Sequence, residues 1–186
     1  MRGRHSGAGA VTMVTTDHLI LRPLTEADHA DYAQVWAKPE VVRFLPSGTI
    51  VAAEAAERAR LRASEWEAAW RDDGIAPWAV VEKSSGCLLG HLGLRMLPEL
   101  NEAELLFMLD SAYWGRGYAV EGGIAALDYG FGTRGVERVL GMVVPENTPS
   151  HRVFGKLGFV FDGERQMFGQ TAVYYTLDRA RWLQRF

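Results

Sequence analysis

The stretch AELLFMLDSAYWGRGYA, residues 103–119, sets an apolar run directly against a turn with two glycines. The run over residues 103–109 predicts a strand, and the residues from Tyr118 to Gly130 or Thr133 predict a helix. The first amide N–H groups of a helix have no partner within it, and the helix dipole makes that end positive. Because glycine lets the backbone approach an anion closely, this segment predicts an anion site suited to a pyrophosphate.

Two common phosphate-binding motifs do not fit this turn. The dinucleotide motif G-x-G-x-x-G needs a third glycine at the position of Val120, and a P-loop needs Lys and then Ser or Thr after Gly117. A glycine-rich turn can also be a plain helix cap. By itself, the turn therefore indicates an anion site without naming the anion.

The rest of the chain predicts one α+β domain with a mixed sheet and the layered character of a three-layer α/β fold. We expect strands at residues 19–21, 78–82, 88–97, 103–109, 138–144, 159–168 and 171–177, and helices at 25–36, 49–71, 118–130 or 133, 150–157 and 178–184. A single crossover through the Tyr118 helix makes the fourth and fifth strands parallel neighbours. Residues 1–14 lack periodicity and predict a disordered extension, which leaves 15–186 as a single domain.

Local patterns add detail at the first two helices. Thr25 and Asp28 form a capping-box-like arrangement at the start of the first helix. Residues 41–45 read as a short apolar segment that ends in a turn at residues 46–48. Trp66 and Trp70 are one helical turn apart, so we expect them to share a buried face.

Composition excludes several classes of protein. The chain has 186 residues and a net charge of −3, which argues against general nucleic-acid binding through phosphate neutralisation. No uninterrupted apolar stretch is long enough to span a membrane, and the histidines lack the spacing of metal ligands. Cys87, the only cysteine, lies in an apolar strand-like stretch, where we expect a structural thiol. A chain without an internal disulfide fits a reducing cytoplasm.

Two further segments stand out beside the opening stretch: DHLILRPLTEAD at residues 17–28 and ENTPSHRVFGKLGF at residues 146–159. Together the three segments resemble the GNAT acetyltransferases, and within them the RimJ/RimL-like branch of ribosomal-protein N-terminal acetyltransferases. Gly117 and Ala119 match the small positions of the family motif Q/R-x-x-G-x-G/A. Trp114 replaces the usual Gln or Arg, as is typical of that branch. The segments stand in the family's order and spacing, and the resemblance covers the chain from about Thr16.

The resemblance implies the GNAT fold and acetyl-CoA as cofactor. The fold is a mostly antiparallel sheet of about seven strands, flanked by helices and splayed between the fourth and fifth strands. The pantetheine arm would lie in that gap against backbone groups of Phe107, Met108 and Leu109. The implied cofactor-binding residues also include Trp114, Gly115, Arg116, Gly117, Tyr118 and Ala119 of the turn, and Asn147, Ser150, Phe154 and Lys156 after the fifth strand. For Arg116 the alternative is a solvated surface side chain, and for Ser150 a helix N-cap.

The catalytic residues are inferred from the same resemblance. Glu104 matches a family glutamate and is the expected base for the amine, with Glu102 and Glu121 as competitors and a surface role as the alternative. Oxyanion stabilisation is expected from a backbone N–H near Met108. Many relatives protonate the leaving thiolate with a tyrosine, where this chain has Phe154, so Ser150 is the expected hydrogen-bond donor. Direct transfer in a ternary complex is preferred to an acyl-enzyme on Cys87.

The acceptor is a primary amine, either a protein N-terminal α-amine or a small-molecule amine. The expected lining residues are aromatic, with core packing as the alternative: Trp36, Phe44, Trp78 and Tyr174. Transfer of a longer acyl group such as succinyl, and a non-catalytic acyl-CoA sensor, stay open as other functions. The chain is expected to be a monomer or a homodimer, the latter through exposed apolar residues such as Trp182 and Phe186.

Overall fold

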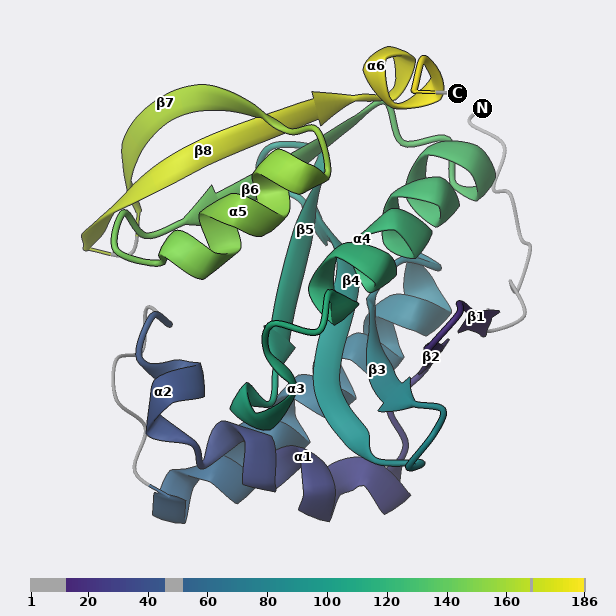
Figure 1. The fold of residues 1–186 in the computed structure, drawn as a ribbon, viewed down its shortest axis with the longest axis vertical. Helices are drawn as coiled ribbons and strands as arrows, with labels where there is room; N and C mark the ends of the chain where they lie inside the picture. The colour runs from purple at the N-terminus through teal and green to yellow at the C-terminus, as the bar shows by residue number, and fades with distance from the viewer. Residues whose placement is uncertain (1–12, 46–51, 168, 186) are drawn as a thin grey trace, which may run out of the picture.

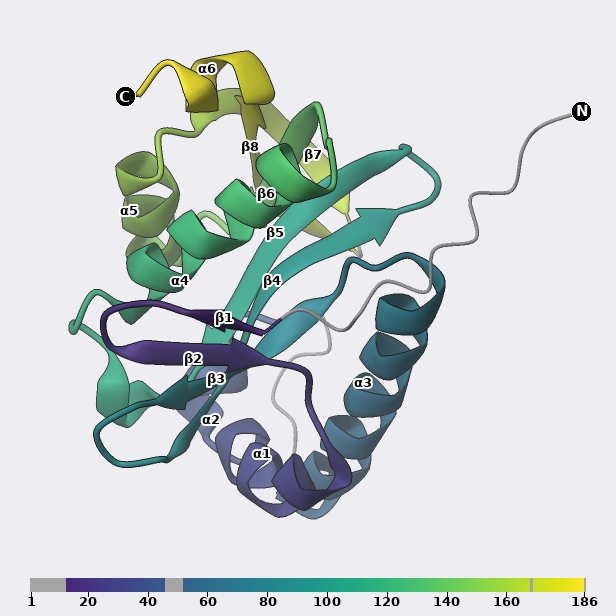
Figure 2. The same cartoon turned by 90° about the vertical axis from the view of Figure 1, so that its right-hand side faces the viewer.

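A computed structural model describes residues 13–45, 52–167 and 169–185. It is built on one eight-stranded sheet in the order β1-β2-β3-β4-β5-β6-β8-β7, with β5 and β6 the only parallel neighbours in the described part. Helices α1 and α3 lie on one face of the sheet, and α4 and α5 on the other (Figures 1 and 2). The expected mixed, mostly antiparallel sheet flanked by helices is confirmed.

The seven expected strands are all present, and an eighth, β1, pairs Val14 with Leu21. Assigning Val14 to a disordered extension was therefore wrong, because that residue joins the edge of the sheet. Residues 1–12 lie outside the described residues. The strands are β1 Val14–Thr15, β2 Leu19–Arg22, β3 Pro77–Glu82, β4 Leu88–Leu97, β5 Glu102–Leu109, β6 Arg138–Val143, β7 Val160–Met167 and β8 Gln170–Asp178.

The helices also follow the expected order, with one addition. The segment expected over residues 41–45 is the short helix α2, which has Pro39 in its first turn, where a missing N–H costs nothing. The turn expected at residues 46–48 lies outside the described residues. The helical segments are η1 Glu26–Asp28, α1 His29–Trp36, α2 Pro39–Val42, α3 Ala52–Asp72, η2 Ser111–Tyr113, α4 Tyr118–Asp128, the π-helical η3 Tyr129–Thr133, α5 Thr148–Lys156 and α6 Arg179–Leu183.

Successive side chains of β5 alternate between the two helical layers. Met108 lies opposite His91 of β4, and the His91 ring packs 4.4 Å from that of Trp66 on α3. Phe107 faces the other way, with its ring 5.8 Å from that of Phe154 on α5. Glu104 and Leu106 therefore share the α1 and α3 side with Met108, because side chains of a strand repeat every second residue.

Aromatic side chains join the end of α3 to β3 and to the end of α4. Trp66 and Trp70 are both buried, as expected from their spacing. Trp70 packs 5.3 Å from Trp78, whose ring also lies 5.2 Å from that of Tyr129. Burying one side chain of this size contributes about 1.5–3 kcal/mol, so these contacts fix α3 against the sheet.

The sheet opens between β5 and β6, as expected for the fourth and fifth predicted strands. The two strands pair only at Ala103 with Val139 and Glu104 with Leu140, near their starts. Beyond these pairs β5 continues to Leu109 and β6 to Val143 without pairing to each other. This seam, bounded by residues 105–109 and 141–143, lies below α4 and α5 (Figure 1).

The end of the chain packs onto the domain. Trp182 on α6 is only 4% exposed, and its indole N–H donates to the Asp128 carboxylate at 2.8 Å. The expectation that Trp182 is exposed was therefore wrong, and Phe186 lies outside the described residues. No helix in the described part of the chain is long and apolar enough to cross a membrane.

Candidate functional site

The glycine turn opens helix α4 beside the seam. Gly115 and Gly117 have φ angles of +79° and +86°, which favour glycine, and Gly117 caps the helix. Val120 and Glu121 both donate their N–H groups to the Gly117 carbonyl at 3.0 Å, whereas those of Tyr118 and Ala119 have no partner within the helix. A Cβ on either glycine would meet nothing within 4 Å. The space beside both glycines is open, as close approach of an anion requires.

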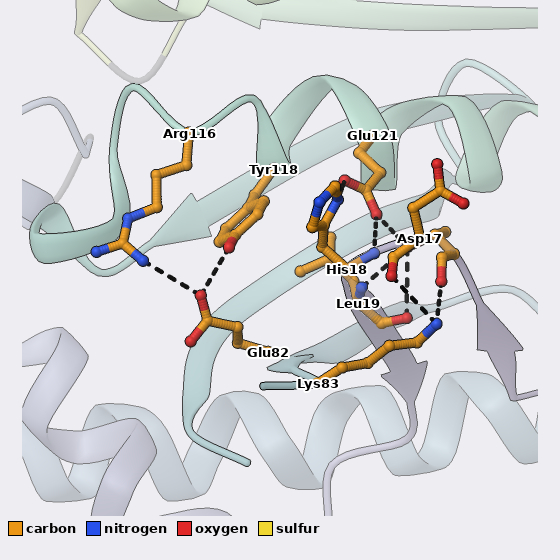
Figure 3. Close-up of polar contacts among 9 residues, drawn as sticks. Asp17, His18, Leu19, Glu82, Lys83, Arg116, Tyr118 and Glu121 are labelled. Carbon is orange, nitrogen blue, oxygen red and sulfur yellow. Dashed lines mark hydrogen bonds and ion pairs between the residues drawn. The ribbon is translucent and has the colours of Figure 1, made fainter. Parts of the chain in front are cut away.

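The side chain of Arg116 is tied to β3 (Figure 3). Its Nη1 lies 3.2 Å from Oε1 of Glu82, and the same oxygen accepts from the Tyr118 hydroxyl at 2.6 Å. Glu82 also accepts a hydrogen bond from the Ser85 hydroxyl at 2.7 Å. The hydrogen bonds from Tyr118 and Ser85 hold the pKa of Glu82 below its usual range. The guanidinium group of Arg116, although half exposed, is therefore paired with Glu82 in this structure.

The first turn of α4 is also fastened to the turn between β1 and β2. The Glu121 carboxylate accepts from the backbone N–H of His18 at 2.8 Å and from the Thr16 hydroxyl at 2.5 Å (Figure 3). A shallow cleft of about 220 Å³ lies beside these contacts, lined by Asp17, His18, Glu82, Lys83, Ser84 and Tyr118. The start of α4 is thus held by β3 and by the turn between β1 and β2.

Trp114 closes the end of β5. Its indole N–H donates to the Leu109 carbonyl at 2.7 Å, although the side chain is 45% exposed. Asp110, which follows Leu109, forms an ion pair with Lys38 and accepts a hydrogen bond from the N–H of Ala112 at 2.9 Å. The connection from α1 to α2 is thereby tied to the turn.

Backbone groups of alternate β5 residues face the seam. Asp110 donates its N–H to Leu89 of the β4 side at 2.7 Å, so the groups of Met108, two residues earlier, face β4 as well. Those of Phe107 and Leu109 face β6, and the Leu109 carbonyl is already taken by Trp114. Phe107 is therefore the residue of β5 best placed to pair with an extended ligand in the seam.

The start of α5 differs from the expectation for Ser150. Asn147 is the N-cap, because its side-chain oxygen accepts the Ser150 N–H at 3.3 Å, and Ser150 is the third helical residue. Phe154 is buried and stacks on Tyr175 with ring centroids 5.5 Å apart, so it forms a wall behind the seam. Lys156 is exposed.

His151 is half-buried on α5. Its Nε2 lies 3.2 Å from the Val144 carbonyl oxygen, and its Nδ1 lies 2.8 Å from the Tyr175 hydroxyl. This contact joins α5 to β8 beside the seam.

Glu104 is buried in the sheet and paired with Arg95. Its Oε2 accepts from Nε of Arg95, its cross-strand partner on β4, at 2.5 Å. Burial raises the pKa of Glu104, although Arg95 opposes the shift. The surface role considered for Glu104 was wrong. The competing carboxylates are engaged elsewhere, Glu102 with Arg138 at 3.8 Å and Glu121 with His18 and Thr16.

The expected acceptor residues lie in different places. Trp78 is 1% exposed and packed between Trp70 at the end of α3 and Tyr129 just after α4, so it does not line a groove. Trp36 is buried with its ring edge on Tyr32, and Phe44 is half-buried beside Arg43. Tyr174 is buried on the same side of the sheet as Glu104, because its neighbour Tyr175 faces α5.

Sequence reasoning missed two groups at this site. Arg95 lies opposite Glu104 because residues 98–101 form the turn that pairs Leu97 with Glu102. Extending that hairpin register by two residues would have found it. The Nδ1 atom of His91 shares a hydrogen bond of 2.8 Å with the Tyr32 hydroxyl. Burial lowers the pKa of His91 to about 3, so its ring is neutral.

The remaining candidate groups are the Cys87 thiol and possible metal ligands. Cys87 is exposed in the turn between β3 and β4, not buried in a strand as expected. No group of three or more His, Cys, Asp or Glu side chains in the described part of the chain is arranged to hold a metal ion.

Comparison with known proteins gives consistent matches. The acetyltransferase (GNAT) domain family matches residues 18–160. The uncharacterized N-acetyltransferases YoaA and YnaD of Bacillus subtilis (strain 168) are 26% and 25% identical over 165 and 150 residues. These alignments cover 88% and 81% of this chain, and 92% and 84% of the two relatives.

Solved structures share the fold. The acetyltransferase from Agrobacterium tumefaciens str. C58 has a TM-score of 0.77 at 24% identity, over 94% of this chain and 99% of its own. The ribosomal-protein-S5-alanine acetyltransferase from Vibrio fischeri has a TM-score of 0.72 at 17% identity, over 92% of this chain and 98% of its own.

Proposed function

This chain belongs to the GNAT acetyltransferase family, and from that premise we propose that it transfers acetyl from acetyl-CoA directly to a primary amine. The observation that carries the proposal is a seam with free backbone groups that leads to an open helix N-terminus. Membership of the family implies acyl transfer. The amine acceptor and the direct, ternary mechanism are our own assignments.

The described residues fit acetyl-CoA. The N–H groups of Gly117, Tyr118 and Ala119 suit the pyrophosphate, and the open space before Gly115 and Gly117 admits it. Phe107 and Leu109 offer backbone groups to the pantetheine arm in the manner of an added strand. Asn147 and Ser150 flank the arm from α5. Phe154 backs the channel without reaching its surface.

Glu104 is the proposed base. A buried carboxylate with a raised pKa is a better proton acceptor than a solvated one at neutral pH. Arg95 donates only to Oε2 of Glu104, so Oε1 can receive the proton. It takes a proton from the ammonium group of the acceptor, and the neutral nitrogen then forms the new C–N bond. An α-amine, with a pKa near about 8, needs less help than a lysine near about 10.4.

The leaving sulfur is the other point where this chain acts. The thioester supplies an activated acetyl group, whose C–S bond breaks as the amide forms. Ser150 is the proposed hydrogen-bond donor to the departing thiolate, because Phe154 lacks a hydroxyl. A thiol pKa near about 8.5 makes this departure undemanding.

The acceptor face lies on the α1 and α3 side of the sheet, with Trp36, Phe44 and Tyr174 as its proposed lining. We favour the RimJ/RimL-like branch on Trp114 and on the fold shared with the Vibrio fischeri enzyme. The chain would act as one domain in the cytoplasm, as a monomer or homodimer. Transfer of succinyl and a non-catalytic sensor are the competing outcomes of the tests.

The donor site is tested by Gly117→Glu. Its carboxylate would enter the anion site, so calorimetry should find the affinity for CoA reduced at least about a hundredfold. Gly132→Glu is the matched control, because Gly132 is exposed and its Cβ meets nothing within 4 Å. Equal affinities of the two variants would contradict the placement of the donor.

The base is tested by Glu104→Gln, which keeps the side-chain shape. We expect kcat to fall about a hundredfold or more without a change in CoA affinity, and the acid limb of the pH–rate profile to disappear. Glu102→Gln, two residue pairs away and joined to Arg138, should keep both. An unaltered pH–rate profile would remove Glu104 as the base. Mass spectrometry with acetyl-CoA, succinyl-CoA and an amine panel separates the competing functions.

A further inference from the structure

Arg95 carries a guanidinium group that the contacts described above use only in part. Its Nε alone donates to Glu104, and no other hydrogen bond of Arg95 to a described residue is present. An arginine has five N–H donors, four of them on the two terminal nitrogens. The side chain of Arg95 is 31% exposed, whereas that of Glu104 is 7% exposed. The open side of this ion pair is therefore its cationic end.

The pair lies where an acceptor amine must arrive. Arg95 and Glu104 are cross-strand partners on the α1 and α3 side, at the residue pair where β5 and β6 last touch. Tyr174 lies on this side, with the Arg165 guanidinium 4.2 Å above its ring. Arg165 is itself engaged with Asp162 at 3.1 Å, and Arg62 with Glu65 at 2.7 Å. Among these cations, Arg95 has its terminal nitrogens left for a ligand.

A carboxylate and a guanidinium fixed side by side complement a molecule with the opposite charges side by side. Glu104 binds only one oxygen to Arg95, so the other can accept from an ammonium group. The terminal nitrogens of Arg95 form a planar fork that matches a carboxylate in a bidentate way. In an α-amino acid a single carbon separates the amine from the carboxylate, so both ends can meet the pair together.

We propose that the acceptor carries a carboxylate next to its primary amine, and that Arg95 binds this carboxylate while Glu104 receives the amine. The proposal rests on the proposed function and narrows its acceptor. Arg95 is a specificity-determining residue in this account. The carboxylate can come from a free amino acid or from an acidic first residue of a peptide, and the experiment distinguishes the two.

The test compares phenylalanine with phenylalaninamide, using acetyl-CoA and the full chain. Rates are compared per unprotonated amine, because the amide is the less basic acceptor. The native protein should prefer phenylalanine in kcat/KM by about tenfold to a hundredfold, the contribution of a charge-assisted hydrogen bond. Peptide amides that begin with Asp or Asn form the second pair. A preference confined to Asp would assign the carboxylate to the first side chain.

Arg95→Lys keeps the positive charge beside Glu104 but removes the fork, so the preference should fall to near unity while the amide is still acetylated. Arg62→Lys is the matched control on the same side of the sheet and should keep the preference. Calorimetry of N-acetylphenylalanine and its amide with the CoA-loaded protein provides a readout independent of turnover.

Equal kcat/KM for the acid and amide members of both pairs would overturn the inference while the proposed function stands. An unchanged preference in Arg95→Lys would overturn the role of Arg95. If no amine is acetylated although CoA binds, the proposed function fails. In that case the calorimetry of N-acetylphenylalanine and its amide alone decides whether Arg95 binds a carboxylate.

Discussion

Asp28 connects β2 to α1 through four hydrogen bonds, and its replacement by Asn tests how much they contribute. Arg22 donates to both carboxylate oxygens at 2.7 Å, and the Thr25 N–H and hydroxyl donate to one of them at 2.7 and 2.8 Å. The Asp28 side chain is 8% exposed and that of Arg22 is 32% exposed. Asn removes the charge and turns an NH2 group toward these donors.

Breaking a buried pair costs about 3–5 kcal/mol, and the partial exposure of Arg22 reduces this to about 2–3 kcal/mol. For a domain of this size that corresponds to a Tm lower by about 4–12 °C. Burial raises the pKa of Asp28, but its hydrogen bonds to Arg22 and Thr25 outweigh that effect, so the net shift is downward. A depressed carboxyl pKa stabilises the fold above the unfolded value, near about 3.9, and this contribution is lost as pH falls through the folded pKa.

Thermal unfolding of both proteins by circular dichroism from pH 7 to pH 3 is the assay. The difference in free energy of unfolding should be full at pH 6–7, within the about 2–3 kcal/mol estimated above, and should shrink below about pH 4. Glu26→Gln, on the same 3-10 turn but exposed, is the control and should change little. A difference that stays constant down to pH 3 would refute the reasoning, because it would not depend on the ionised carboxylate.

Two further predictions concern the seam and the single thiol. Gly141→Ala places a Cβ 2.2 Å from the Phe154 ring and should destabilise the protein by about 1–3 kcal/mol in urea unfolding, whereas Gly155→Ala on α5 meets nothing within 4 Å and should not destabilise it. Cys87→Ser, and alkylation of the exposed Cys87, should leave amine acetylation unchanged in a mass-spectrometric assay, because direct transfer needs no thiol; loss of turnover in both would point to an acyl-enzyme.

The parts of the fold that the sequence predicts well are those governed by local chemistry. The apolar run into Gly115 and Gly117 specifies a strand, a glycine turn and a helix, and Thr25 with Asp28 specifies a capping box. The two-residue strand β1 was missed because so short a segment carries no periodicity and is held only by its partner β2. Trp182 was misjudged because its burial depends on Phe131 and Asp128, about fifty residues earlier.

The candidate site divides in the same way. The residues proposed to act through their backbone, at the turn and in β5, lie in a strand and a helix start that the sequence predicts. Residues that act through side chains depend on register, as with Arg95 opposite Glu104, or on a partner from another element, as with Arg116 on Glu82. Asn147 displaced Ser150 as the helix cap because helix boundaries shift by a residue or two for reasons no local pattern shows.

The seam divides the sheet into two units of strands. Strands β1 to β5 and strands β6 to β8 meet along only two residue pairs, so thermal fluctuations should separate them there before either unit unfolds. A bound extended ligand would act as the missing strand and raise the opening free energy by RT ln(1 + [L]/Kd). Hydrogen exchange at the Phe107 amide would then report occupancy directly, and the enzyme would be most rigid at the moment when its donor is in place.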